Sequence, residues 1–195
     1  RKKRIFFEET NLNTLPENNF DQPKNFPGLI EDEIAKLKYN RTNTIPYTYN
    51  YLVPLIKKLN KKEIDFLDVG AGTLKNYFLL TNNFQDLNYF YYDVPEKKRI
   101  IENNVRKENF KKIFVCNHDD IKNNKFDIVF LGSCIQYISN YESFINILLE
   151  RKPSFILFTA MPSFNSNYDN RNFFVIKQLN LYPSINYLYQ FNINE

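Results

Sequence analysis

Short apolar runs alternate with segments of helical spacing from residue 64 onward, and this alternation constrains the fold more than any other feature. Runs that are apolar on both faces and alternate with helices are typical of a mostly parallel sheet covered on both sides. Right-handed crossovers then predict a doubly wound α/β fold. The expected strands are Ile64–Val69, Tyr89–Tyr92, Ile113–Cys116, Ile128–Leu131 and Phe155–Thr159, and the expected helices are Leu74–Asn82, Lys97–Asn109 and Tyr141–Leu149.

The chain before this region is expected to form an arm followed by helices. Residues 1–27 show no sustained period, so we predict an extended arm with little independent structure. Leu29–Leu37 places apolar groups at helical spacing, with acids early and lysines late, as the helix dipole prefers. Tyr47–Leu59 predicts a second helix, in which Pro54 would introduce a kink or mark the true first turn.

The end of the chain is less regular than its middle. After Pro162 the alternation fades, and Phe173–Leu179 and Ile185–Phe191 are compatible with a further helix or with strands. We therefore divide the chain into an N-terminal arm and helix, residues 1–44, and a doubly wound domain, residues 45–195.

Charge and cysteine usage narrow the classes of function. The net charge is only +4 and the basic residues form short runs beside acids, so we expect no nucleic-acid partner. Cys116 and Cys134 lack a CxxC partner, which predicts no metal site and two buried thiols in a reducing cytoplasm. No run reaches the roughly 18 apolar residues of a membrane span. We expect a cytoplasmic protein whose oligomeric state the sequence leaves open.

Acids, glycines and small polar residues follow the expected strands at their carboxyl ends, where doubly wound sheets bind ligands. The first strand ends at Asp68 and continues into the turn Gly70-Ala71-Gly72, and the second strand ends at Asp93. The third strand runs into Asn117-His118-Asp119-Asp120, and the fourth ends at Gly132-Ser133-Cys134. We expect these groups to gather along one edge of the sheet.

Each group suits part of a nucleotide-like ligand. Gly70 and Gly72 let backbone N–H groups approach a ligand at the start of a helix, whose dipole favours a carboxylate. Asp93 lies 25 positions after the acid of the first strand, about the separation at which a second-strand acid binds ribose hydroxyls. Asp119 or Asp120 could accept a hydrogen bond from an adenine amino group. The glycine turn alone does not choose between cofactors.

These residues resemble a known superfamily. Asp68-x-Gly70-x-Gly72 with Asp93 resembles motifs I and II of the class I S-adenosylmethionine-dependent methyltransferases, and the stretch from Phe126 to Ile138 is similar to their strand-four motif. The chain also resembles, more narrowly, a bacterial family of methyltransferases without an assigned substrate, often encoded among surface-polysaccharide genes. The stretches that carry this narrower resemblance are Asp68 to Phe78, Tyr92-Asp93-Val94-Pro95, Ser133 to Tyr137 and Thr159 to Phe164.

The resemblance implies a Rossmann-like methyltransferase fold that binds S-adenosyl-L-methionine. The first-strand acid would orient the methionine amino group, and the glycine turn would pass under the methionine and ribose. The second-strand acid would hold the ribose hydroxyls, and the residue after the fourth strand would border the methyl-transfer site. The implied cofactor-binding residues are Asp68, Gly70, Ala71, Gly72, Asp93, Val94, His118, Asp119 and Ser133, and the implied substrate-binding residues are Gln136 and Tyr137.

Two departures from the family pattern bear on these roles. The superfamily commonly has a third glycine where Leu74 stands, beside an unusual Lys75, so a large side chain could close part of the pocket or the turn could run differently. The chain stops 36 residues after the fifth strand, where such enzymes usually add a helix and an antiparallel strand pair. We therefore expect either an abbreviated C-terminal end or a truncated sequence.

The function expected from this resemblance is methyl transfer to an oxygen or nitrogen of a small or saccharide-linked acceptor. Such transfer depends mainly on holding the reacting atoms in line, so no catalytic residue is assigned. Structural interpretations stand beside the functional ones: Asp93 could only open a turn, His118 could be a hydrogen-bonded loop residue, and Tyr137 could be structural. The alternatives for the whole chain are a non-catalytic relative and a nicotinamide-dependent oxidoreductase, whose G-x-G-x-x-G turn would need glycine at Lys75.

Overall fold

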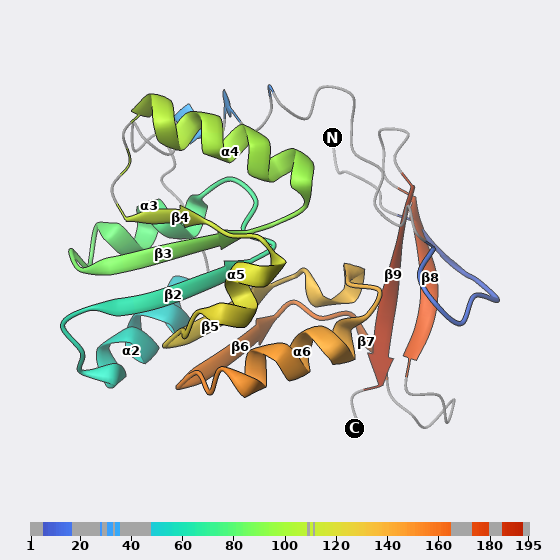
Figure 1. Cartoon of the computed structure of the whole chain (residues 1–195). Coiled ribbons are helices and arrows are strands. Elements are labelled where there is room, and N and C mark those ends of the chain that lie inside the picture. Colours follow the sequence, from blue (N-terminus) through green and yellow to red (C-terminus); the bar gives the residue numbers. More distant parts are fainter. Residues whose placement is uncertain are drawn as a thin grey trace. The chain divides into compact units, whose positions relative to one another are not determined.

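The computed structural model of the chain describes residues 6–16, 28, 31–32, 34–35, 48–108, 110, 112–164, 173–179 and 185–192 (Figure 1). The chain forms two compact units, which we name by their sheets. The parallel-sheet unit comprises Pro27–Gly132 and Ser143–Thr159, and the mixed-sheet unit comprises Arg1–Phe26, Ser133–Glu142 and Ala160–Glu195. The proposed boundary between residues 44 and 45 lies outside the described residues.

The parallel-sheet unit contains a five-stranded sheet in which every neighbouring pair is parallel. The strand order β4-β3-β2-β5-β6 reverses between β2 and β5, and this reversal is the topological switch point of a doubly wound sheet. The predicted fold class is confirmed. The strands are β2 (Ile64–Val69), β3 (Leu87–Tyr92), β4 (Ile113–Val115), β5 (Ile128–Gly132) and β6 (Phe155–Thr159).

The helices that connect these strands lie close to their predicted positions. The described residues between 28 and 35 are helical, and Pro54 lies inside a helix rather than in its first turn. A six-residue helix in the short connection after β4 was not predicted. No helix of the described residues is long and apolar enough to cross a membrane. The helices are α2 (Tyr49–Leu59), α3 (Lys75–Thr81), α4 (Pro95–Glu108), α5 (His118–Asn123) and α6 (Tyr141–Glu150).

Aromatic rings cover both faces of the parallel sheet. Tyr89 of β3 stacks on Phe66 of β2 at 5.7 Å between ring centroids, and Tyr77 of α3 meets it edge-on at 5.5 Å. Tyr92 points to the other face, because side chains alternate along a strand, and stacks on Phe144 of α6 at 5.7 Å. Helices α3 and α6 therefore cover opposite faces of the sheet (Figure 1).

The mixed-sheet unit shows which secondary structure the C-terminal segments adopt, which the sequence left open between a helix and strands. Its sheet has the order β1-β8-β9-β7, with β8 antiparallel to β1 and β9, and β7 parallel to β9. The segments at 173–179 and 185–192 are thus strands, and the described part of the expected arm contributes a strand instead of remaining without structure. The strands are β1 (Phe6–Glu9), β7 (Ser163–Phe164), β8 (Phe173–Leu179) and β9 (Ile185–Asn192).

A small aromatic core holds the mixed-sheet unit together. Tyr189 of β9 is 2% exposed and lies 4.8 Å from Phe173 and 5.3 Å from Tyr141 between ring centroids. Leu15 and Val175 are buried against the same cluster. The apolar side of the β8–β9 pair therefore packs on rings of its own unit.

Candidate functional site

The turn after β2 alternates left-handed residues with ordinary ones. Gly70, Gly72 and Leu74 have φ angles of 67°, 63° and 63°, a region that costs a residue with a side chain about 1–2 kcal/mol. Leu74 therefore adopts the conformation expected of the glycine that the family pattern has at this position. Its side chain is fully buried, at 0% exposure, so it fills the interior and does not line an open cleft.

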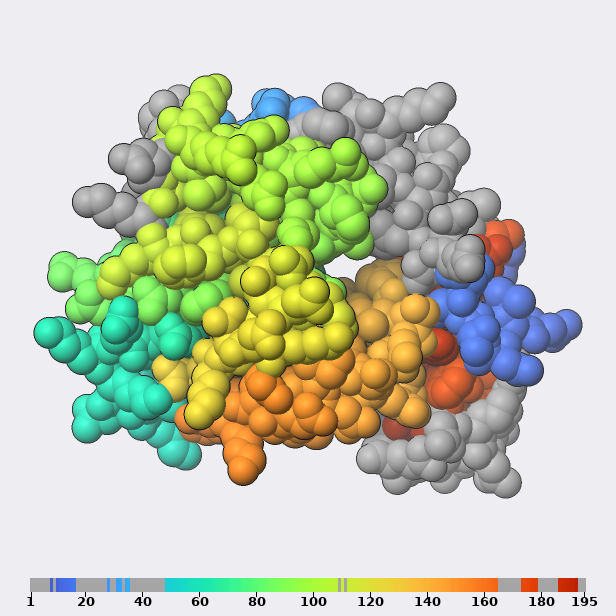
Figure 2. All heavy atoms as spheres, in the orientation of Figure 1, coloured from blue at the N-terminus to red at the C-terminus, as the bar shows by residue number. Residues whose placement is uncertain are grey.

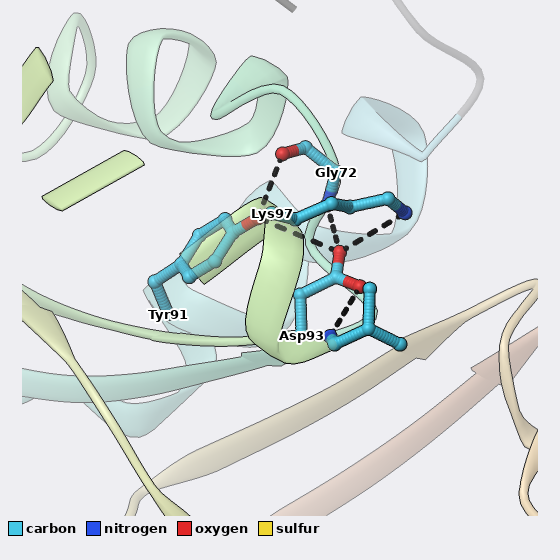
Figure 3. A network of polar contacts seen from close by, with 5 residues as sticks. Gly72, Tyr91, Asp93 and Lys97 are labelled. Atoms are coloured by element: carbon cyan, nitrogen blue, oxygen red, sulfur yellow. Dashed lines mark hydrogen bonds and ion pairs between the residues drawn. The ribbon is translucent and has the colours of Figure 1, made fainter. Parts of the chain in front are cut away.

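The Gly72 peptide is held on both sides by neighbouring side chains (Figure 3). Its N–H donates to Asp93 Oδ2 at 2.8 Å, and its C=O accepts from the Tyr91 hydroxyl at 2.9 Å. A Cβ built on Gly72 would meet no atom within 4 Å. The turn is thus fixed by Tyr91 of β3 and by Asp93 just after that strand, while the space beside the Gly72 Cα stays open.

The Asp93 carboxylate is almost fully engaged by the protein. Oδ2 accepts from Gly72 N–H and from Lys97 Nζ at 3.3 Å, with the Tyr91 hydroxyl at 3.5 Å, and Oδ1 accepts from Val94 N–H at 2.8 Å. The side chain is only 5% exposed and forms an ion pair with Lys97, in the first turn of α4. Asp93 is therefore more than the opening residue of a turn, because it links the ends of β2, β3 and α4.

Asp68 forms a second buried network beneath the turn. Its Oδ2 accepts from the Tyr89 hydroxyl and from Asn76 Nδ2, the latter at 2.8 Å, and the residue is 1% exposed. Burial raises the pKa of Asp68 to about 7, although both hydrogen bonds favour the ionised form and act against this rise. Asp68 is poised to gain or lose a proton near neutral pH.

Sequence reasoning missed four members of these networks: Asn76, Tyr89, Tyr91 and Lys97. Tyr89 and Tyr91 were expected only as part of a buried strand, and both are buried in β3 at 0% exposure. Their two-residue spacing was the available signal, because it sends both hydroxyls to the same face of the sheet. Lys97 stands four residues after Asp93, the helical spacing at which opposite charges meet.

The residues after β4 form a helix cap. Asn117 caps α5 by accepting from Asp120 N–H at 2.9 Å, and Asp120 Oδ2 accepts from Asn117 N–H at 2.7 Å. His118 is exposed and stacks on Phe144 of α6, and the α5 and α6 surfaces lie side by side in Figure 2. Asp119 is 83% exposed and, among the described residues, pairs only with Lys122, at 3.9 Å. Of the two acids, Asp119 alone is left to face a ligand, because Asp120 serves the cap.

The residues after β5 belong to the mixed-sheet unit and form a tight turn. Ser133 has a φ of 56°, and the 3₁₀ helix η1 (Ile135–Tyr137) follows it. Gln136 is 2% exposed; its Nε2 donates to Ser133 O at 3.0 Å and lies 3.3 Å from Ser133 Oγ. Its Oε1 is buried and accepts no hydrogen bond from the part of the chain that the structure describes. The Tyr137 hydroxyl donates to Gln178 Oε1 at 3.2 Å.

The structure thus connects some of the candidate residues and leaves others in separate clusters. Gly72, Asp93 and Val94 share one network at the carboxyl ends of β2 and β3. Asp68 lies in its own network, His118 and Asp119 start α5, and Ser133, Gln136 and Tyr137 lie in the mixed-sheet unit. Within the described residues, no group of three or more His, Cys, Asp or Glu side chains could hold a metal ion.

Comparisons with known proteins find similar structures only. No family model and no curated protein matches the sequence. The chain is similar to an S-adenosylmethionine-dependent methyltransferase from Clostridium acetobutylicum, with 16% identity and a TM-score of 0.46 over 85% of this chain and 82% of that chain. It is also similar to the 1,6-didemethyltoxoflavin-N1-methyltransferase of Burkholderia thailandensis, solved with bound 1,6-didemethyltoxoflavin and S-adenosylhomocysteine. The identity is 15% and the TM-score 0.46, over 99% of this chain and 80% of that chain.

A third similar structure is matched over a shorter stretch. The precorrin-6y C5,15-methyltransferase of Geobacter metallireducens has 19% identity and a TM-score of 0.36 over 51% of this chain and 55% of that chain. This chain therefore spans about half the length of that protein. Identities and TM-scores this low do not assign an activity, so the function has to be argued from the site itself.

Proposed function

We propose that the parallel-sheet unit binds S-adenosyl-L-methionine and that the protein is a methyltransferase. The observation that carries this proposal is the Gly72 peptide, whose N–H is held by Asp93 and whose C=O is held by Tyr91 while the space beside its Cα is open. The turn lies at the carboxyl end of β2, beside the switch point of the sheet. Because the turn is already fixed, a ligand that binds there has little backbone to order.

The residues present suit the parts of this cofactor. Asp68 is a buried acid beneath the turn, and a ligand ammonium group would stabilise its ionised form. Backbone groups of Gly70, Ala71 and Gly72 would pass under the methionine and ribose. Asp93 would accept from a ribose hydroxyl, and Val94, which follows it directly, would lie against the adenine.

Two further groups of residues complete the proposed roles. His118 and Asp119 are exposed at the start of α5 and would lie near the adenine edge, and Ser133 would border the methyl-transfer site. When bound, S-adenosylmethionine supplies an electrophilic methyl group on its sulfonium sulfur. The protein's task is then to bind, orient and exclude water, since alignment supplies much of the rate in such transfers. No residue is assigned as a base.

We assign the binding of the methyl acceptor to Gln136 and Tyr137. The buried Oε1 of Gln136 receives no hydrogen bond from the described residues, and leaving a buried oxygen without one costs about 1–3 kcal/mol. Its Nε2 donates to Ser133 O, which fixes the orientation of the amide. A methyl acceptor that carries an N–H or O–H group would donate the missing hydrogen bond to Oε1, in keeping with transfer to nitrogen or oxygen. Tyr137 follows in the same turn, and a small or saccharide-linked acceptor carries the required donors.

One observation favours the non-catalytic alternative. Protein donors already fill much of the Asp93 carboxylate, as they would in a relative that no longer binds a nucleotide. Leu74 no longer supports this alternative, because its buried side chain does not line a cleft. The two interpretations differ in whether any adenosyl ligand binds.

The test is calorimetric titration of the protein with S-adenosylmethionine, S-adenosylhomocysteine and NAD. We expect both adenosyl ligands to bind and NAD to give no heat. Binding of NAD alone would support a nicotinamide-dependent enzyme, and no binding of any of the three ligands would support the non-catalytic relative.

A further inference from the structure

The hydrogen-bond capacity of Asp93 limits how it can hold a ribose. Oδ2 already accepts the Gly72 N–H and the Lys97 ammonium, with the Tyr91 hydroxyl at 3.5 Å. Among the described residues, Oδ1 accepts only Val94 N–H. A carboxylate oxygen offers about two lone-pair sites, so Oδ1 has room for one more donor and Oδ2 has none without releasing the turn. Asp93 can therefore take one ribose hydroxyl while Gly72 stays clamped, and the second hydroxyl needs another partner.

We propose that Lys97 is that partner and is a ribose-specificity residue of the adenosyl site. This inference rests on the proposed function. In the bound state, the Lys97 ammonium donates to one ribose oxygen, Asp93 Oδ1 accepts from the other hydroxyl, and Oδ2 keeps its bond to Gly72. The two ribose hydroxyls are then recognised by groups of opposite polarity.

The position of Lys97 suits this role. Its side chain is 16% exposed, so the ammonium is held close to the carboxylate and is not freely extended into water. It contacts the same oxygen that accepts from Gly72, and Figure 3 shows the Lys97 amine and the Gly72 peptide converging on that oxygen. An ammonium group has three N–H donors and can donate to more than one oxygen at once. A ligand oxygen beside Oδ1 would lie within reach of both charged groups.

The competing explanation is structural. An ion pair at i, i+4 stabilises the start of a helix by itself, and Lys97 could do no more than that. A structural lysine would affect thermal stability and would not distinguish a ribose from a deoxyribose. The discrimination between these sugars is therefore the decisive measurement.

The experiment compares Lys97→Met with Lys98→Met by titration with three ligands: S-adenosylhomocysteine and its 2′-deoxy and 3′-deoxy analogues. Lys98 is the matched control, because it carries the same charge on the same helix and has no contact with Asp93 within the described residues. We expect Lys97→Met to weaken S-adenosylhomocysteine binding about tenfold or more, the range of a charged hydrogen bond. Lys98→Met should bind like the wild type, and Lys97→Arg should recover part of the loss.

The analogues identify the hydroxyl that Lys97 contacts. For one deoxy analogue, Lys97→Met and the wild type should bind equally, because the oxygen that the lysine would contact is absent. For the other analogue, the loss of about tenfold should persist. Equal losses with all three ligands, or no loss with any, would overturn the role of Lys97. Failure of the wild type to bind S-adenosylhomocysteine would instead overturn the proposed function, so the two failures are distinguishable.

Discussion

Asp93 accepts the backbone N–H of Gly72 through Oδ2 at 2.8 Å, although 21 residues separate them in the sequence. The bond ties the turn after β2 to the end of the neighbouring strand β3. Tyr91 of β3 donates to the Gly72 carbonyl, so a β3 residue and the residue that follows this strand hold the Gly72 backbone from both sides. The acid that the sequence indicated as a ribose ligand is therefore also a structural part of the cofactor turn.

Replacing Asp93 should weaken both the ligand site and the fold. Asp93→Ala removes the acceptor of Gly72, Val94 and Lys97, so we expect a loss of about 1–3 kcal/mol in S-adenosylhomocysteine binding. Calorimetric titration measures this loss, and urea unfolding shows how much stability is lost with it. Glu96→Ala is the control, since that acid is 57% exposed and, within the described part of the chain, pairs only with Arg99, at 3.8 Å. Unchanged affinity in a folded Asp93 variant would show that the acid serves the turn alone.

The relative stabilities of two Leu74 variants should reveal the backbone strain at this position. Both Leu74→Ala and Leu74→Gly remove a fully buried side chain, at a cost of about 2–5 kcal/mol. Only glycine relieves the cost of φ 63°, about 1–2 kcal/mol. We therefore expect the glycine variant to be about 1 kcal/mol more stable than the alanine variant in urea unfolding.

Leu80 supplies the matched control for this comparison. It is also fully buried, but it lies in the helix α3, where glycine is about 1 kcal/mol less favourable than alanine. The order of stability should therefore invert, with Leu80→Ala above Leu80→Gly. The same order at both positions would contradict the strained conformation of Leu74.

The parallel sheet was predictable because its signal is local. A window of about six to ten residues is enough to recognise a strand that is apolar on both faces or a helix with a regular apolar stripe. Strands β2, β3, β5 and β6 lie where this pattern predicted them. The mixed sheet was not predictable in the same way. Strand β1 gains its stability from pairing with β8, more than 160 residues later, and a four-residue strand has no periodic signal of its own.

The site was predictable in its acids and glycines but not in its hydrogen bonds. Asp93 could be found by its distance from Asp68, whereas the clamp from Tyr91 to Gly72 depends on the register of β2 against β3. The spacing of tyrosines in a strand predicts the face of the sheet that their hydroxyls reach, but not the groups to which they donate. The capping role of Asp120 was predictable, because an Asn followed three residues later by an acid is the sequence pattern of a capping box. The sequence prediction considered only a ligand-binding role for this acid.

The two acids after β4 should separate binding from stability. Asp120→Ala removes the capping box of α5 and should cost about 1 kcal/mol of stability in urea unfolding without changing S-adenosylhomocysteine affinity. Asp119→Ala alters an exposed side chain, so stability should stay within about 0.5 kcal/mol. If Asp119 binds the adenine edge, its loss should weaken the ligand several-fold. The reverse assignment would make Asp120 the adenine ligand and remove Asp119 from the site.

Asp68 should make the stability of the ligand-free protein depend on pH. Its pKa is about 7 in the folded protein and about 3.9 in an unfolded chain, so the folded state holds a proton that the unfolded state has released. Between about pH 4 and pH 7, this group should lower the free energy of unfolding by up to about 1.4 kcal/mol for each unit of rising pH. Its contribution is fully present below pH 4 and is lost above pH 7.

Asp68→Asn isolates this contribution, because asparagine resembles the protonated acid in shape and still offers an oxygen to Tyr89 and Asn76. The free energy of unfolding of both proteins is measured in urea from pH 4 to pH 8. In the difference between the two values, the titration of the groups that both proteins share cancels. The wild type should lose stability relative to Asp68→Asn as pH rises. Tyr89→Phe removes a hydrogen bond that favours the ionised form of Asp68. The pH range over which this variant loses stability should therefore extend above pH 7. A pH-independent difference between the wild type and Asp68→Asn would mean that Asp68 keeps an ordinary pKa despite its burial.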